Sequence, residues 1–227
     1  MKHKITSNLI LLFLTPVCVV SGMFIFSEKQ YIFSILIVSA LSVTAFLLRL
    51  EKNKTDVEKA VIIAVMTALS ILSRVAFQFT PSFKPVTAMV IITGMYLGKE
   101  AGFMCGAFTA LLSNFIFGQG PWTPFQMLSW GIIGVIASMM SNILKKNVIL
   151  TSIIGGLFGI LYSLLMDIYS VLWIDSTFVL SRYIALVATS LPVTITYVVS
   201  TIIFLLVLTK PVGKQLDRVM KKYNIKP

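Results

Sequence analysis

Long apolar stretches recur along this chain, and several approach or exceed the length needed to cross a membrane. A helix of about 20 apolar residues spans the hydrocarbon of a bilayer, where unpaired backbone groups find no partner. Apolar residues make up 57% of the 227 and charged residues only 12%, a composition typical of membrane proteins. We therefore predict an all-α, polytopic membrane helix bundle with eight spans: Leu9–Phe26, Tyr31–Leu48, Val57–Phe79, Val86–Leu97, Ala101–Phe117, Met127–Met140, Val148–Trp173 and Tyr183–Thr209.

The positions of the basic residues predict the orientation of these spans. With the N-terminus inside, 15 of the 19 lysines and arginines fall in inner loops or the tail, and only Lys29, Arg74, Lys84 and Arg182 do not. Short cytoplasmic loops are enriched in Lys and Arg. We expect a multi-pass protein of the plasma membrane with both termini in the cytoplasm. The net charge of +11 then reflects topology and contact with the lipid bilayer, so no nucleic-acid partner is expected.

Charge and proline positions divide the chain into three parts. Residues 1–50 are predicted to form an N-terminal transmembrane helix pair, in preference to a signal peptide, because no good small-residue cleavage site follows the early leucine run. Residues 51–209 form a six-helix body, in which Val86–Leu97 is too short to span untilted and Pro192 is expected to kink the last helix. Residues 210–227 form a basic cytoplasmic tail, expected to be helical at the membrane surface.

One uncharged corner, Asn114–Met127, separates two apolar runs of the body. Gly118, Gly120, Pro121 and Pro124 prevent a continuous helix there, yet the corner carries polar and aromatic groups suited to a small ligand: Asn114, Gln119, Trp122 and Gln126. The alternative is a stiff corner with Trp122 in the interfacial aromatic belt. If the corner binds ligand, we expect the Trp122 ring to contribute more than the Gln126 amide.

Two ionisable residues, Arg74 and Asp167, lie within predicted spans. Charges at membrane depth usually face the protein interior or a wet cavity. Either the two residues form an ion pair that joins two helices, or one or both contact a polar ligand.

Small residues recur at four-residue spacing on the third span, at Ala60, Ala64 and Ala68. Such a stripe allows another helix backbone to approach closely, and we interpret it as a docking surface for a partner subunit. The glycine pairs Gly94/Gly98, Gly102/Gly106 and Gly155/Gly159 fit packing within the subunit. No hydrolase, metalloprotease or P-loop motif is present, so we expect no enzyme activity, catalytic residue, cofactor or metal site.

The body resembles the substrate-binding subunits (S components) of energy-coupling factor (ECF) transporters. The resemblance rests on the AxxxA-type motif Ala64–Ala68, the proline-rich Phe83–Val86 before a short helix, the Leu97–Gly102 turn, and the block from Ser113 to Gln126. It covers about three quarters of the chain, and the extra N-terminal helix pair departs from it.

The resemblance implies a vitamin-binding six-helix bundle that works with a transmembrane scaffold subunit and two cytoplasmic ATPases. It implies that Ala64 and Ala68, with Ala60, dock on the scaffold. It also implies a substrate site near the outer face, for which we single out Arg74, Lys84, Asn114, Gln119, Trp122, Gln126 and Asp167.

The corner block also resembles sequences linked to cobalamin or corrinoid uptake, so a corrinoid is the first ligand expected. Such a large ligand would need a broad mouth lined by methionines and aromatic rings. The alternatives to this function are a self-contained secondary transporter, which would need coupled ionisable residues, and a membrane scaffold protein that transports nothing.

Overall fold

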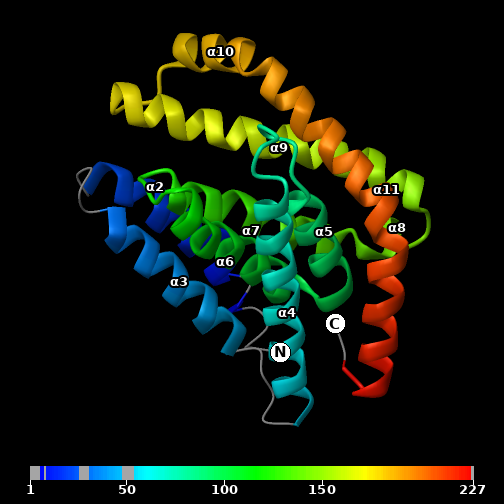
Figure 1. Ribbon diagram of the computed structural model, residues 1–227. Helices are drawn as coiled ribbons and strands as arrows, with labels where there is room; N and C mark the ends of the chain where they lie inside the picture. The colour runs from blue at the N-terminus through cyan, green and yellow to red at the C-terminus, as the bar shows by residue number, and fades with distance from the viewer. Residues whose placement is uncertain (1–5, 8, 26–30, 48–53, 226–227) are drawn as a thin grey trace.

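Helices form the regular structure of residues 6–7, 9–25, 31–47 and 54–225, which are the residues that the computed structural model describes (Figure 1). A helix or helix pair lies at each of the eight predicted spans. Their bounds are η1 (Ile10–Leu14), α2 (Thr15–Ile25), α3 (Tyr31–Leu47), α4 (Lys54–Ala76), α5 (Val86–Leu97), α6 (Lys99–Phe117), α7 (Thr123–Met139), α8 (Ser141–Leu144), α9 (Val148–Asp175), α10 (Leu180–Thr189) and α11 (Leu191–Lys222). Of these, α4, α6, α9 and α11 are long and apolar enough to cross a membrane; the full count of eight spans stays a prediction.

The short helix α5 forms the centre of the bundle. Every residue of α5 except Tyr96 is buried, and the helix packs against α4, α6, α7 and α11. Gly94 permits this arrangement, because a methyl group there would collide with the backbone of Gly134 on α7. Gly102 on α6 meets the same crossing. The prediction that these glycines serve internal packing is therefore confirmed, and the short helix α5 is enclosed by protein.

The last predicted span differs from the kinked helix that we expected. Residues 180–222 form two helices, α10 and α11, separated at Ser190. Pro192 lies in the first turn of α11, where the missing N–H costs no hydrogen bond. The chain therefore breaks just before Pro192, and α10 folds back beside the end of α9 (Figure 1).

The basic tail continues α11, so the boundary that we placed at residue 209 falls inside a helix. The helix runs through Pro211 to Lys222. Its apolar positions Leu216 and Met220 are buried, and α11 packs along α9 and α5. The helical spacing of the tail was correctly predicted. The apolar stripe of the tail packs on the protein, and its position at the membrane surface stays a prediction.

The N-terminal helix pair is attached to one side of the body. Helix α3 packs on α6 and α7, and α2 packs on α3 and α7. The Ser7 hydroxyl donates a hydrogen bond to Glu100 Oε1 at 2.9 Å, at the start of α6. In Figure 1 the pair lies to the left of α4.

Candidate functional site

The side chain of Arg74, in the last turn of α4, is buried and reaches α6. Its Nη1 donates hydrogen bonds to Ser113 Oγ and, at 2.9 Å, to Asn114 Oδ1. Its guanidinium carbon lies 4.7 Å from the ring centre of Phe117 and 5.3 Å from that of Trp130. None of these partners carries a negative charge. Arg74 therefore keeps an uncompensated positive charge inside the bundle, stabilised by amide, hydroxyl and π-electron acceptors.

Asn114 joins Arg74 to the corner between α6 and α7. Its Nδ2 donates to Thr123 Oγ1 at 2.9 Å and to Gln126 Oε1 at 2.8 Å, while its Oδ1 accepts from Arg74. All the polar groups of this amide are therefore in use. The result is a fixed polar junction that orients Arg74 and Gln126.

The corner itself is folded tightly on α6. Gln119 Nε2 donates to the Leu111 carbonyl at 2.8 Å, and Gln119 Oε1 accepts from Thr123 Oγ1 at 3.0 Å. Thr123 is fully buried at the start of α7. These hydrogen bonds brace the corner against α6. Gln119 contributes to it as a structural brace and not as a group that faces open space.

Aromatic side chains of α7, α9 and α11 form a wall next to this polar junction. The rings of Trp130 and Tyr162 are stacked, with centroids 4.9 Å apart and planes 11° from parallel. Tyr197 meets Tyr162 edge-on at 5.0 Å. The side chain of Tyr162 lies close to those of Gln126 and Tyr197, whereas Trp130 Nε1 is buried with no hydrogen-bond partner among the described residues. We refer to Arg74, Ser113, Asn114, Phe117, Gln126, Trp130, Tyr162 and Tyr197 as the Arg74 cluster.

Lys84 brings a second cation to the same place from the loop between α4 and α5. Its Nζ lies 4.9 Å from the centre of the Phe117 ring, and Ser200 on α11 donates a hydrogen bond to its backbone carbonyl at 2.9 Å. Burial lowers the pKa of Lys84, and repulsion by Arg74 lowers it further. Two cations against one ring favour a ligand that presents electron-rich acceptors.

Asp167 does not pair with Arg74, and the ion-pair interpretation of these two residues was wrong. Asp167 is buried on α9, where its Oδ2 accepts a hydrogen bond from Ser190 Oγ at 2.9 Å. This contact holds the break between α10 and α11 against α9. The helices that carry Arg74 and Asp167, α4 and α9, both pack against α5.

The structure brings together Arg74, Lys84, Asn114 and Gln126, with Gln119 bracing them. Trp122 is 38% exposed and covers Gly120, so it lies outside the hydrogen-bonded junction. Sequence reasoning did not assign Ser113, Phe117, Tyr162 or Tyr197 to the site. Tyrosines in the middle of apolar spans were the available signal for the last two, because a buried hydroxyl needs a partner.

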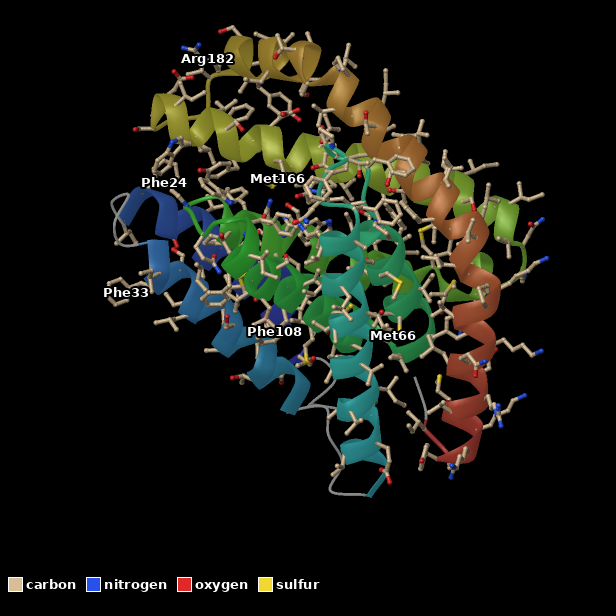
Figure 2. All side chains as sticks on the ribbon, viewed as in Figure 1. Phe24, Phe33, Met66, Phe108, Met166 and Arg182 are labelled. Carbon is tan, nitrogen blue, oxygen red and sulfur yellow. The ribbon has the colours of Figure 1, made fainter. Side chains whose placement is uncertain are left out.

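The alanine stripe lies at the other end of α4 and borders a groove. Ala64 and Ala68 are exposed and Ala60 is half-buried. The groove has a volume of about 260 Å³, and its described lining comes from α4 and α6: Ala60, Ile63, Ala64, Thr67, Ala68, Ile71, Met104, Phe108 and Leu112. Figure 2 labels Phe108 of α6, to the left of α4, which contributes to the groove. This surface is apolar, concave and open.

A family model of the ECF-type riboflavin transporter S component matches residues 54–214, which include the Arg74 cluster and the alanine groove. The chain belongs to this family. No curated protein and no solved structure matches it. As an ECF S component it is a multi-pass membrane subunit of a vitamin transporter and not an enzyme. Such subunits bind small-molecule substrates and work with a scaffold and ATPases. The N-terminal helix pair lies outside the matched residues.

Proposed function

We propose that this S component binds riboflavin at the Arg74 cluster and delivers it inward together with a transmembrane scaffold subunit and two cytoplasmic ATPases. The observation that carries this proposal is the buried, uncompensated Arg74 beside stacked aromatic rings. The isoalloxazine ring of riboflavin is planar and has carbonyl and ring-nitrogen acceptors along one edge. An Arg donor and an aromatic face suit that combination.

The methionines favour a flavin over the corrinoid that the sequence first suggests. A broad mouth for a corrinoid would draw on Met89, Met95 and Met127. These side chains are at most 4% exposed and belong to the core, so they are engaged in packing. A corrinoid remains the alternative ligand and is included in the test below.

The groove along Ala60, Ala64 and Ala68 supports scaffold docking on α4. Alanine lets a second helix approach closely, and contact energy between membrane helices comes mainly from such packing. The N-terminal pair packs on α6 and α7, and the described lining of the groove includes none of its residues. The described residues of the pair therefore leave this docking surface open.

The proposed orientation puts the α4–α5 loop outside and the α8–α9 link inside. Phe79 in that loop is 89% exposed and Lys146 in that link is exposed. In a variant without Cys18 and Cys105, an impermeant thiol reagent added to whole cells should label Phe79→Cys but not Lys146→Cys. Equal labelling of both would contradict the orientation.

Fluorescence titration tests the ligand directly, because a flavin stacked on Trp or Tyr loses its emission. Purified protein should quench riboflavin stoichiometrically, and excess cobalamin should not restore the emission. Arg74→Gln should weaken binding, whereas the exposed Arg182→Gln, which only loses a surface ion pair with Asp175, should not. If the protein binds cobalamin and does not bind riboflavin, the substrate is a corrinoid and not a flavin. Uptake by a subunit that assembles with no ATPase would instead favour a secondary transporter.

A further inference from the structure

A second polar pocket lies between the start of α9 and the C-terminal half of α11, far from the Arg74 cluster. Its volume is about 690 Å³. Along α9, Val148 at this pocket and Tyr162 in the cluster are 14 residues apart, or about 21 Å at helical rise. The pocket therefore lies near the opposite membrane boundary, on the predicted cytoplasmic side.

The described lining of this pocket carries a large excess of positive charge. Five lysines line it, together with one carboxylate, that of Asp217: Lys145, Lys146, Lys210, Lys214 and Lys221. Burial lowers the pKa of Lys145, and the Asp217 carboxylate only partly opposes this effect. Five lysines around one carboxylate leave a positive potential in the pocket, which attracts an anion that is not part of the chain.

Neutral hydrogen-bond donors point to the same kind of ligand. Thr209 lines the pocket, and its hydroxyl is buried with no hydrogen-bond partner among the described residues. Helix α9 begins at Val148 in the pocket wall, so the positive end of its dipole faces the same space. Lysines, a free hydroxyl and a helix N-terminus together form a site for a phosphate group.

Exposed apolar side chains continue from the lysines along α9 and α11. Ile149 lines the pocket and is 63% exposed, and Ile153 follows one turn later at 58%. On α11, Leu206 is exposed one turn before Lys210. A soluble phosphate would gain nothing from these positions. A phospholipid fits them because its headgroup phosphate and its acyl chains are joined in this order across the membrane boundary.

We propose that the pocket between α9 and α11 binds the phosphate headgroup of an anionic phospholipid, with the acyl chains lying along Ile149, Ile153 and Leu206. The lysines supply charge attraction, and Thr209 supplies a directed hydrogen bond. This lipid site is separate from the substrate site proposed at the Arg74 cluster.

Native mass spectrometry of the full chain, released from mixed micelles of phosphatidylglycerol and phosphatidylcholine, tests the proposal. The wild type should retain one phosphatidylglycerol in preference to phosphatidylcholine. Lys210→Gln/Lys214→Gln should lower that retention at least tenfold. Arg218→Gln/Lys222→Gln removes the same charge from the same helix but from residues outside the pocket lining, and it should change retention less than twofold.

Two further variants guard against loss of folding as the explanation. Asp217→Asn removes the one carboxylate of the described lining and should strengthen phosphatidylglycerol retention, which an unfolded protein would not do. Thr209→Val should weaken retention severalfold without changing charge. Equal losses in the two double variants would overturn the proposal, because they would show nonspecific attraction.

The remaining outcomes identify other occupants. If 10 mM inorganic phosphate displaces phosphatidylglycerol completely and binds the wild type equally well without lipid, the site is for a free anion and the lipid proposal fails. If Lys210→Gln/Lys214→Gln retains phosphatidylglycerol but no longer assembles with the ATPases, the lysines face an acidic protein surface. That result would also overturn the proposal.

Discussion

The last turn of α4 carries the buried Arg74, whereas the preceding turns present Ala60, Ala64 and Ala68 along an open groove. Ala64 and Arg74 are ten residues apart, about 15 Å along the helix axis. One end has polar groups that are satisfied inside the subunit, and the other has apolar groups that are not covered. The comparison indicates that one helix can carry a substrate site and a partner surface because burial separates them.

The largest expected effect comes from a bulky side chain in the alanine stripe, which should block partner docking and leave substrate binding at Arg74 intact. Ala64→Trp should reduce co-purification of the scaffold and ATPases to less than about a tenth, because a bulky ring prevents close helix approach. Riboflavin quenching by the isolated variant should stay within about twofold of the wild type. Val65→Trp is the matched control, since Val65 is exposed but does not line the groove. A joint loss of binding and assembly in Ala64→Trp would show that the stripe stabilises the subunit itself.

The converse change acts on the other end of α4. Arg74→Gln should raise the Kd for riboflavin about 10- to 100-fold, the range expected for losing charge-assisted hydrogen bonds of about 1.5–3 kcal/mol. Assembly with the scaffold should not change, because the groove residues are untouched. Titration with riboflavin measures the Kd, and co-purification from the same preparation measures assembly with the scaffold. An unchanged Kd would exclude Arg74 from the substrate site.

The corner gives a smaller effect, in an order that reverses the expectation from sequence. Gln126 accepts from Asn114 and contacts Tyr162, so Gln126→Ala should raise the Kd about tenfold, including the cost of the partners left unpaired. Trp122 is exposed and covers Gly120, so Trp122→Ala should raise the Kd less than about fivefold. A larger loss for Trp122→Ala would restore the corner as the lid of the site.

The smallest effect concerns the pH dependence of the unliganded protein. The pKa of Lys84 is lowered by burial and by Arg74, so the unfolded state binds more protons at alkaline pH and stability should rise as pH increases through that lowered pKa. In the wild type this rise should amount to less than about 2 °C in melting temperature between pH 8 and 10. The Lys84→Met variant should lack it. Thermal melts at closely spaced pH values measure it. A rise of the same size in both proteins would assign it to another group.

Much of the candidate site could be predicted because charge and amides are conspicuous in an apolar sequence. Arg74 stands out in a span, and Asn114, Gln119 and Gln126 stand out in a corner without charge. Membrane depth makes such groups costly unless they have a partner, so their presence indicates a polar junction. The pattern could not distinguish Gln119, which braces the corner, from Gln126, which lies near the aromatic wall, because both are glutamines of the same uncharged corner.

The sequence by itself determined the helical class, the short helix at Val86–Leu97 and the alanine stripe, since these depend on apolar length and local spacing. Only the tertiary structure decided the partners of Arg74 and Asp167, which could equally have paired. It also decided that α11 continues into the basic tail and meets α9 and α5, which creates the lysine pocket. The physical reason is that hydrogen-bond partners and converging lysines come from helices distant in sequence, whose relative placement is fixed by packing and not by local pattern.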